Sequence, residues 1–264
     1  MNLDFNSNFE QCKKFFINPY MQDKAKPFGG LAELKKKDRK EKIKASLAMA
    51  YSTAQRTFGG ISKIEKNKGN IFINLAAKID KEFCSAKAWE SFRDKLNSWR
   101  NELITQFQQS YTMTVGQAQK IINMTFKFLY CLEDKPNEDD YKYCHMPLDS
   151  YTLAWFKKIL GNSKLDNFNC NTKWSNIDDD SLYNTIQDRI HKYLSEQPVP
   201  KLYGKINLDE SSFKSEFVIW YYMQGEELVR TMIKDLSKTP VDFEIYKNVL
   251  GDQIDLLKNL SKLL

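Results

Sequence analysis

The sequence predicts an all-α fold, a compact helical bundle whose two lobes share a central cleft near residues 114–156. Apolar residues recur at intervals of three and four along most of the chain, which is the spacing of one helix face. The composition, 42% hydrophobic and 28% charged, is that of an ordinary globular protein. Glycine and proline are few, and no segment resembles a linker. We therefore expect one helical domain over residues 1–264.

Individual helices follow from this spacing and from the residues that interrupt it. The ranges with helical spacing are 36–57, 70–83, 86–108, a central helix opening at residue 114, 180–196, 211–236 and 241–264. Breakers separate them at 58–60, 161–163, 198–200 and 239–240. Short strand pairs near Phe28 or over 202–206 are a further possibility. Ser211 or Ser212 is placed to cap the helix over 211–236, with Glu216 in its first turns.

Several classes of protein and site are disfavoured by composition. The longest apolar run, 124–132, is too short to cross a bilayer, and the first residues lack a basic start followed by an apolar stretch. Five scattered cysteines with no Cys-x-x-Cys pair suggest a reducing compartment. His145 and His191 are the only histidines, so no zinc-ligand spacing can be recognised. We expect a cytoplasmic monomer without metal, cofactor or membrane contact.

Charge is unevenly distributed along the chain. The net charge is +6, with seven cations and two anions in 35–44 (KKKDRKEKIK) and five acids and one lysine in 133–140 (EDKPNEDD). The basic run is either a solvated helix face with local ion pairs, such as Lys37 with Glu41, or a patch that contacts phosphates. The sequence favours the first interpretation and leaves the second open.

The central helix combines an apolar surface with a polar stripe. Lys120, Asn123 and Lys127 stand at positions i, i+3 and i+7, so they share one face. This face either meets solvent or points into a cleft. Solvent is the favoured interpretation, because charged groups are rarely buried without a partner.

Downstream of this helix, His145-Met146-Pro147-Leu148-Asp149 leads into another helix through Trp155 and Phe156. Asp149 or Ser150 stands where the N-cap of that helix is expected, a purely structural role. The alternative is a chemical role, with Asp149 as a stabilising carboxylate and His145 as a polar or acid–base group.

A glycine-containing turn, a helix with a lysine, and Pro-x-Asp opening another helix together resemble the helix-hairpin-helix DNA glycosylases. Gly116 matches the end of the hairpin, and Pro147-Leu148-Asp149 the Pro-x-Asp element. The wide lysine-to-aspartate separation is most similar to the archaeal 8-oxoguanine glycosylase branch. The resemblance covers about forty of 264 residues. It has one glycine where the usual hairpin has two, and it lacks the cysteines that hold a cluster in some relatives.

The resemblance implies a DNA glycosylase that flips a modified or damaged base out of duplex DNA, with possible strand cleavage. Lys120 would be the nucleophile, with Lys127 competing for that role, and Asp149 would stabilise charge on the sugar. The amides around Gly116 and Gln117 would hold a phosphate at the helix N-terminus. The base would be bound by side chains from a wider set: Asn123, Lys127, His145 and Trp155, with Phe156, Trp220 and Tyr221 as further stacking surfaces.

Two other functions fit the same residues. The first is a non-catalytic helical protein that binds nucleic acid or a partner, with phage defence as a candidate role, in which Lys35, Lys36 and Lys37 would contact phosphates. The second is a small-molecule enzyme or defence effector that uses His145 and Asp149 as acid and base.

Overall fold

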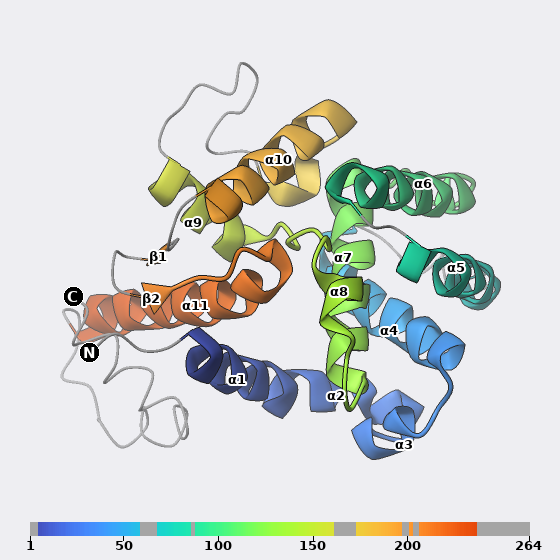
Figure 1. The fold of residues 1–264 in the computed structure, drawn as a ribbon, viewed down its shortest axis with the longest axis horizontal. Helices are drawn as coiled ribbons and strands as arrows, with labels where there is room; N and C mark the ends of the chain where they lie inside the picture. The colour runs from blue at the N-terminus through green and yellow to red at the C-terminus, as the bar shows by residue number, and fades with distance from the viewer. Residues whose placement is uncertain are drawn as a thin grey trace.

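The computed structural model describes residues 5–58, 68–85, 88–160, 173–196, 201–202 and 206–236. Within them the fold is all-α, as the sequence predicted (Figure 1). The one pair of strands described is two residues long on each side, with β1 (Lys201–Leu202) antiparallel to β2 (Ile206–Asn207). The helices are α1 (Phe5–Phe15), α2 (Gln22–Ala25), α3 (Leu31–Lys35), α4 (Arg39–Ala54), α5 (Lys68–Glu82), α6 (Trp89–Phe107), α7 (Val115–Leu132), α8 (Glu138–Tyr141), α9 (Ser150–Leu160), α10 (Asp180–Glu196) and α11 (Ser212–Leu236).

Most predicted helices appear within a few residues of their expected ends. Two differences have local causes. The helix predicted over 36–57 begins only at Arg39, because the Asp38 carboxylate caps it by accepting the backbone N–H of Glu41 at 2.8 Å. The strand considered near Phe28 is a 3₁₀ turn that Gly29 ends with a φ of 84°. The expected helix over 241–264 and the breakers at 59–60, 161–163, 198–200 and 239–240 lie outside the described residues.

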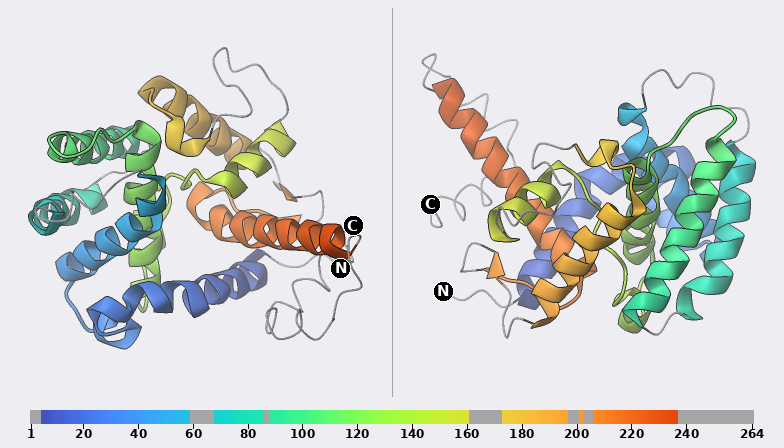
Figure 2. Two further views of the ribbon diagram at one scale, coloured as in Figure 1. Left: turned by 180° about the vertical axis from the view of Figure 1, so that it is seen from behind. Right: turned by 90° about the horizontal axis from the view of Figure 1, so that it is seen from above.

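Helix α7 runs through the centre of the fold. Each of its eighteen residues is buried. It contacts α4, α6 and α10, while α4 and α6 each also contact α5 (Figures 1 and 2). The side chain of Thr114 caps its first turn by accepting the backbone N–H of Gln117 at 3.1 Å. This strongly apolar helix is therefore enclosed by its neighbours.

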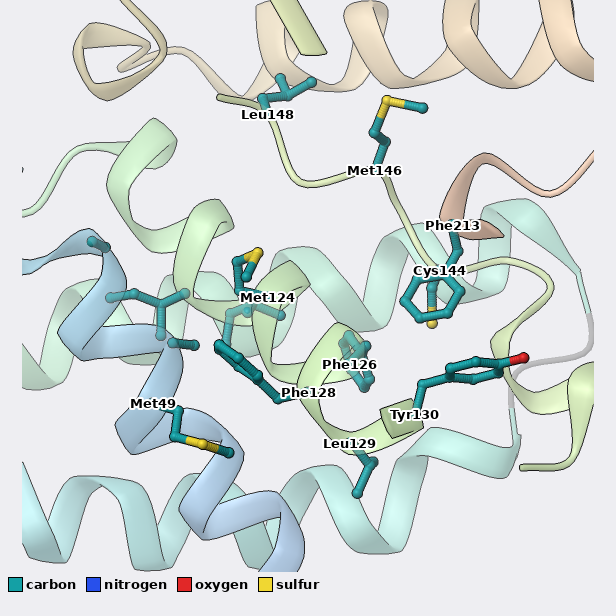
Figure 3. Packing of buried hydrophobic residues seen from close by; sticks show 14 of the residues in the cluster. Met49, Met124, Phe126, Phe128, Leu129, Tyr130, Cys144, Met146, Leu148 and Phe213 are labelled. Carbon is teal, nitrogen blue, oxygen red and sulfur yellow. The ribbon is translucent and has the colours of Figure 1, made fainter. Parts of the chain in front are cut away.

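A second group of helices covers the other side of α7. Helix α11 contacts α1, α9 and α10 (Figure 2). The helical turn η1 (Phe16–Met21) follows α1 and packs against Phe128 of α7. The ring centre of Phe128 lies 5.5 Å from that of Phe16 and 6.4 Å from that of Tyr20. Nearly all buried apolar residues of the described ranges form one continuous cluster, part of which is drawn in Figure 3. The division into two lobes with a shared cleft stays a prediction.

Among the helices that the structure describes, none is long and apolar enough to cross a bilayer.

Candidate functional site

Lys120 and Asp149 meet in the structure. Nζ of Lys120 lies 2.8 Å from Oδ2 of Asp149, and 7% and 11% of their side chains are exposed. Lys120 comes from the second turn of α7, and Asp149 immediately precedes α9. Helix packing therefore brings together two residues that lie 29 positions apart in the chain.

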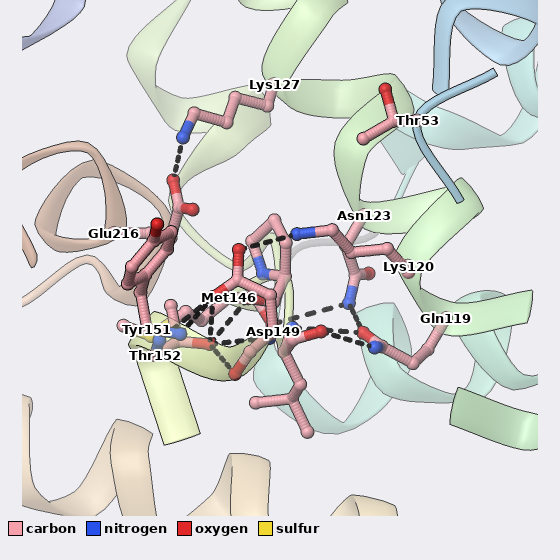
Figure 4. A network of polar contacts seen from close by, with 12 residues as sticks. Thr53, Gln119, Lys120, Asn123, Lys127, Met146, Asp149, Tyr151, Thr152 and Glu216 are labelled. Atoms are coloured by element: carbon pink, nitrogen blue, oxygen red, sulfur yellow. Dashed lines mark hydrogen bonds and ion pairs between the residues drawn. The ribbon is translucent and has the colours of Figure 1, made fainter. Parts of the chain in front are cut away.

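Asp149 has a second task, because its other carboxylate oxygen caps α9. Oδ1 accepts the backbone N–H groups of Tyr151 and Thr152, each at 2.9 Å, which confirms the predicted cap (Figure 4). Burial alone would raise the pKa of Asp149. The charge and hydrogen bond of Lys120, the Thr152 N–H and the charge of Lys127 outweigh burial, so that pKa lies below its usual value. The pair is a carboxylate held ionised beside an amine.

A second buried pair lies two turns further along α7. Lys127 forms an ion pair with Glu216 of α11, and 1% of each side chain is exposed. Three aromatic rings surround the Lys127 ammonium: Nζ lies 4.2 Å from the ring centre of Phe16, 4.4 Å from that of Phe217 and 5.0 Å from that of Trp220. Burial lowers the pKa of Lys127 and raises that of Glu216, while their mutual attraction opposes both shifts.

The interpretation of Lys120, Asn123 and Lys127 as a solvent face is wrong. All three side chains are buried. The rule that charges are rarely buried without a partner still holds, because Asp149 and Glu216 are those partners. Both partners belong to other elements, so the local pattern of α7 could not indicate them.

The chain between α8 and α9 is buried from Cys144 to Asp149 without regular secondary structure, and side-chain amides hold its backbone. Gln119 donates to the Leu148 carbonyl at 3.0 Å and accepts the Leu148 N–H at 3.2 Å. Gln187 of α10 likewise donates to the Met146 carbonyl at 2.7 Å and accepts the Met146 N–H at 3.2 Å. Satisfying these buried peptide groups fixes the path that delivers Asp149 to Lys120 (Figure 4). Neither glutamine was recognised from the sequence, because nothing in its local pattern indicates a backbone partner.

Gly116 packs against the 3₁₀ turn η6 (Trp174–Asn176). Its N–H donates to the Ile177 carbonyl at 2.7 Å, and a Cβ at this position would stand 1.8 Å from the Trp174 carbonyl oxygen. The expectation that this N–H holds a phosphate is therefore wrong for this arrangement, because it already has an acceptor. Gln117 is likewise engaged within the chain: its Nε2 donates to the Thr57 carbonyl at 3.1 Å.

Asn123 and His145 share one buried partner. Asn123 donates to the Tyr183 hydroxyl at 3.0 Å, and Nδ1 of His145 lies 2.9 Å from that hydroxyl. Burial, followed by the charges of Arg100 and Arg93, lowers the pKa of His145 well below its usual value. His145 is thus held neutral in the core, and no contact brings it to Asp149. Contact of Asn123 or His145 with a base stays a prediction.

Trp155, the tryptophan predicted from the sequence to contact the base, is fully buried, whereas Trp174 lies beside Lys120. Trp155 is 0% exposed and contacts Tyr193 edge to face. Trp174 of η6 is half-buried, and its ring centre lies 6.0 Å from Nζ of Lys120. Sequence reasoning missed Trp174, because it lies in no recognisable motif.

A pocket of about 400 Å³ is lined by residues that follow Asp149 in the chain, beginning with Ser150. It lies between α9 and α11, and its lining includes Ser150 and Tyr151 on one side and Met223 and Glu226 on the other. Pockets of several hundred Å³ are the usual size of small-ligand sites. Among the residues that the structure describes, no three His, Cys, Asp or Glu side chains gather closely enough to hold a metal ion.

The basic run 35–44 is partly neutralised by neighbours. Lys35 lies 3.2 Å from Asp134 in the acidic segment 133–140, and Lys36 and Lys44 pair with Glu33 and Glu41 at 2.7 and 2.6 Å. Glu41 therefore pairs with Lys44, and the structure gives no ion pair of Glu41 with Lys37. Lys36 and Lys44 thus pair locally, whereas Lys35 pairs with a carboxylate that lies 99 residues away in the chain.

Comparisons of the chain with protein-family models, with curated proteins and with solved structures found no match.

Proposed function

We propose that this protein is a DNA glycosylase that excises a modified or damaged base with Lys120 as nucleophile and Asp149 as the charge-stabilising carboxylate. The observation that carries the proposal is the 2.8 Å contact between Lys120 and an Asp149 whose orientation is fixed by the cap of α9. An amine beside an oriented carboxylate is what displacement at a sugar carbon requires.

In the proposed reaction the Lys120 amine, having lost its proton to solvent, attacks the anomeric carbon of a flipped nucleotide. The bond from that carbon to the base breaks, and the base leaves with the bonding electrons and takes up a proton from solvent. The nitrogen then gives up one proton and forms a double bond to the anomeric carbon. The bond from that carbon to the ring oxygen breaks, and the ring oxygen keeps the electron pair and takes up a proton, which leaves a protonated Schiff base on Lys120. Asp149 remains a carboxylate throughout and stabilises the positive charge that develops on the sugar.

Lys120 is favoured over Lys127 as the nucleophile because of accessibility. Lys127 is closed off by three aromatic rings and by Glu216, whereas Lys120 and Asp149 retain some exposure. The pocket between α9 and α11 is lined by Ser150 and Tyr151, the two residues that follow Asp149 in the chain, and we assign it to the flipped base. Because η6 covers Gly116, DNA binding in this proposal moves that turn away from the N-terminus of α7.

Borohydride trapping on duplexes that carry different modified bases tests this function. We expect a covalent adduct with the unaltered protein, loss of the adduct in Lys120→Ala, and strongly reduced base release in Asp149→Asn. Lys214→Ala, a partly exposed lysine that pairs with Glu138 on the surface, is the matched control and should trap normally. An adduct that persists in Lys120→Ala but is lost in Lys127→Ala would identify Lys127 as the nucleophile. Absence of base release from every substrate at every pH would contradict the proposal.

Non-catalytic nucleic-acid binding is the alternative that the exposed lysines favour. Lys36 and Lys37 are exposed beside the N-terminus of α4. This alternative predicts salt-dependent DNA binding that is weakened by Lys35→Gln, Lys36→Gln and Lys37→Gln together, without any trapped adduct. Unchanged DNA affinity in that triple variant would exclude this surface.

A further inference from the structure

Another cavity lies between α2, α4 and α5, apart from the residues of the proposed reaction. Its volume is about 570 Å³, which is within the range of small-ligand pockets. Its wall also includes residues of two 3₁₀ turns, η2 (Lys26–Phe28) and η3 (Gln55–Thr57) (Figure 1). Neither Lys120 nor Asp149 nor any residue that lines the pocket between α9 and α11 belongs to this wall. The proposed reaction therefore leaves the cavity without a role.

Apolar side chains form much of the cavity wall. Met49 of α4 and Phe72 of α5 are buried and belong to the continuous core cluster. Phe28 of η2 is half-buried and packs against that cluster. Ile73 of α5 is 43% exposed, and among the residues that the structure describes no other large apolar side chain is comparably exposed. The cavity therefore keeps apolar surface in contact with water, and a ligand with an apolar body would cover it.

The charged residues of the cavity wall are all lysines. Lys24 comes from α2, Lys44 from α4 and Lys68 from the start of α5, and no described aspartate or glutamate lines the cavity. Lys44 has a carboxylate partner outside the wall, Glu41, at 2.6 Å. Nζ of Lys68 lies 5.7 Å from the ring centre of Tyr51, which also lines the cavity. Three ammonium groups around one concave apolar wall create a positive potential that attracts an anion.

Uncharged polar groups are scarce in this wall, which bears on the kind of anion that fits. The hydroxyl of Ser52 already donates to the Met49 carbonyl at 2.9 Å. Gln55 is the one amide side chain among the described residues of the wall. A nucleotide needs several fixed donors and acceptors to orient its base and sugar. A hydrocarbon chain needs none, because burial of its apolar surface holds it, and a flexible methionine adapts to its shape.

We propose that this cavity binds an amphipathic carboxylate, a single hydrocarbon chain with one anionic end. The chain lies against Met49, Phe72 and Ile73, and the three lysines of the wall attract the carboxylate. Binding is non-covalent and uses none of the residues assigned to the glycosylase reaction. The proposal therefore stands or falls independently of that function.

Isothermal titration calorimetry of the whole protein with decanoate, kept below the concentration at which it forms micelles, tests this proposal. We expect saturable binding of one decanoate per chain. Decanol, which has the same chain without the charge, should bind about fivefold more weakly or worse. Added salt should weaken the binding of decanoate and leave that of decanol nearly unchanged, because salt screens only the charged contact.

Two pairs of variants locate the binding. Lys24→Gln with Lys68→Gln removes two charges of the wall and should lower the affinity for decanoate roughly fivefold to twentyfold. Lys81→Gln, at an exposed lysine of α5 outside the wall, is its control and should leave the affinity unchanged. Ile73→Ser should lower the affinity about fivefold, because less apolar area is covered. Asn74→Ser, at the exposed neighbour outside the wall, should have no effect.

Circular dichroism establishes that each variant is folded before its affinity is compared. If the double lysine variant does not fold, Lys44→Gln removes a charge of the same wall and should also weaken binding. An absence of decanoate binding, or an affinity that the lysine and Ile73 variants leave unchanged, overturns this inference. Displacement of decanoate by AMP at lower concentration would assign the cavity to nucleotides and would also overturn it.

Discussion

Asp149 and Thr152 cap α9 reciprocally: Oδ1 of Asp149 accepts the Thr152 N–H at 2.9 Å, and Oγ1 of Thr152 accepts the Asp149 N–H at 2.8 Å. The Thr152 hydroxyl also donates to the Pro147 carbonyl at 3.0 Å. This arrangement leaves Oδ2 of Asp149 to Lys120. One carboxylate therefore both starts a helix and binds the buried amine, so its structural role and its proposed chemical role coexist.

Thr152→Val should destabilise the protein. The substitution keeps the shape of the side chain but leaves the buried Asp149 N–H and Pro147 carbonyl without the hydroxyl. Unsatisfied buried polar groups cost about 1 to 3 kcal/mol, and urea unfolding measures the loss. Thr185→Val, at a surface threonine of α10 whose hydroxyl bonds to the preceding turn, is the control and should change stability by about 0.5 kcal/mol or less. Equal losses of stability in the two variants would contradict the prediction that the Thr152 hydroxyl stabilises this cap.

Removing one charge of the Lys120–Asp149 pair should lower the free energy of unfolding more than removing both charges. Lys120→Met leaves a buried carboxylate without its counter-ion, and we expect a loss of about 3 kcal/mol. Asp149→Asn retains an oxygen for the cap of α9 but leaves the ammonium unpaired. The double variant should be more stable than the sum of the two single losses predicts, as urea unfolding of all four proteins would show. Strict additivity would mean that the two groups do not interact.

Gly116→Ala should be strongly destabilising although alanine is the better helix former. The new methyl group would stand 1.8 Å from the Trp174 carbonyl oxygen, so η6 must move away from α7. Gly69→Ala is the matched control because it also lies in a helix and a Cβ there has nothing within 4 Å. That control should leave stability unchanged or raise it by up to about 1 kcal/mol. Thermal unfolding measures both, and a neutral Gly116→Ala would contradict the close contact.

His145 should make stability fall as the pH falls below its ordinary titration range. Its folded pKa is depressed well below 6.5 by burial, so the unfolded chain binds the proton more readily. The stability contribution is therefore complete above about pH 6.5 and is lost progressively at more acidic pH. His145→Gln should flatten the dependence of unfolding free energy on pH between about 7 and 5. His191→Gln, at a half-buried histidine, should flatten it less, and an unchanged slope in His145→Gln would show that this histidine is not buried neutral.

The sequence by itself determined the all-α class and the approximate extent of most long helices. Periodic apolar residues specify which face of a helix is buried, and capping residues such as Thr114 and Asp149 specify where it begins. These signals are local, so they can be read without the fold. The same local signals did not indicate the helices before residue 36.

Only the tertiary structure decided what the polar residues of α7 do. Lys120 and Lys127 look alike in the sequence, yet Lys120 meets Asp149 and Lys127 meets Glu216 inside an aromatic enclosure. A buried charge is tolerated only where another element supplies the opposite charge, and that element lies 29 or 89 residues away. The chain pattern specifies the faces of helices, whereas the partner of each buried group is set by how the helices pack.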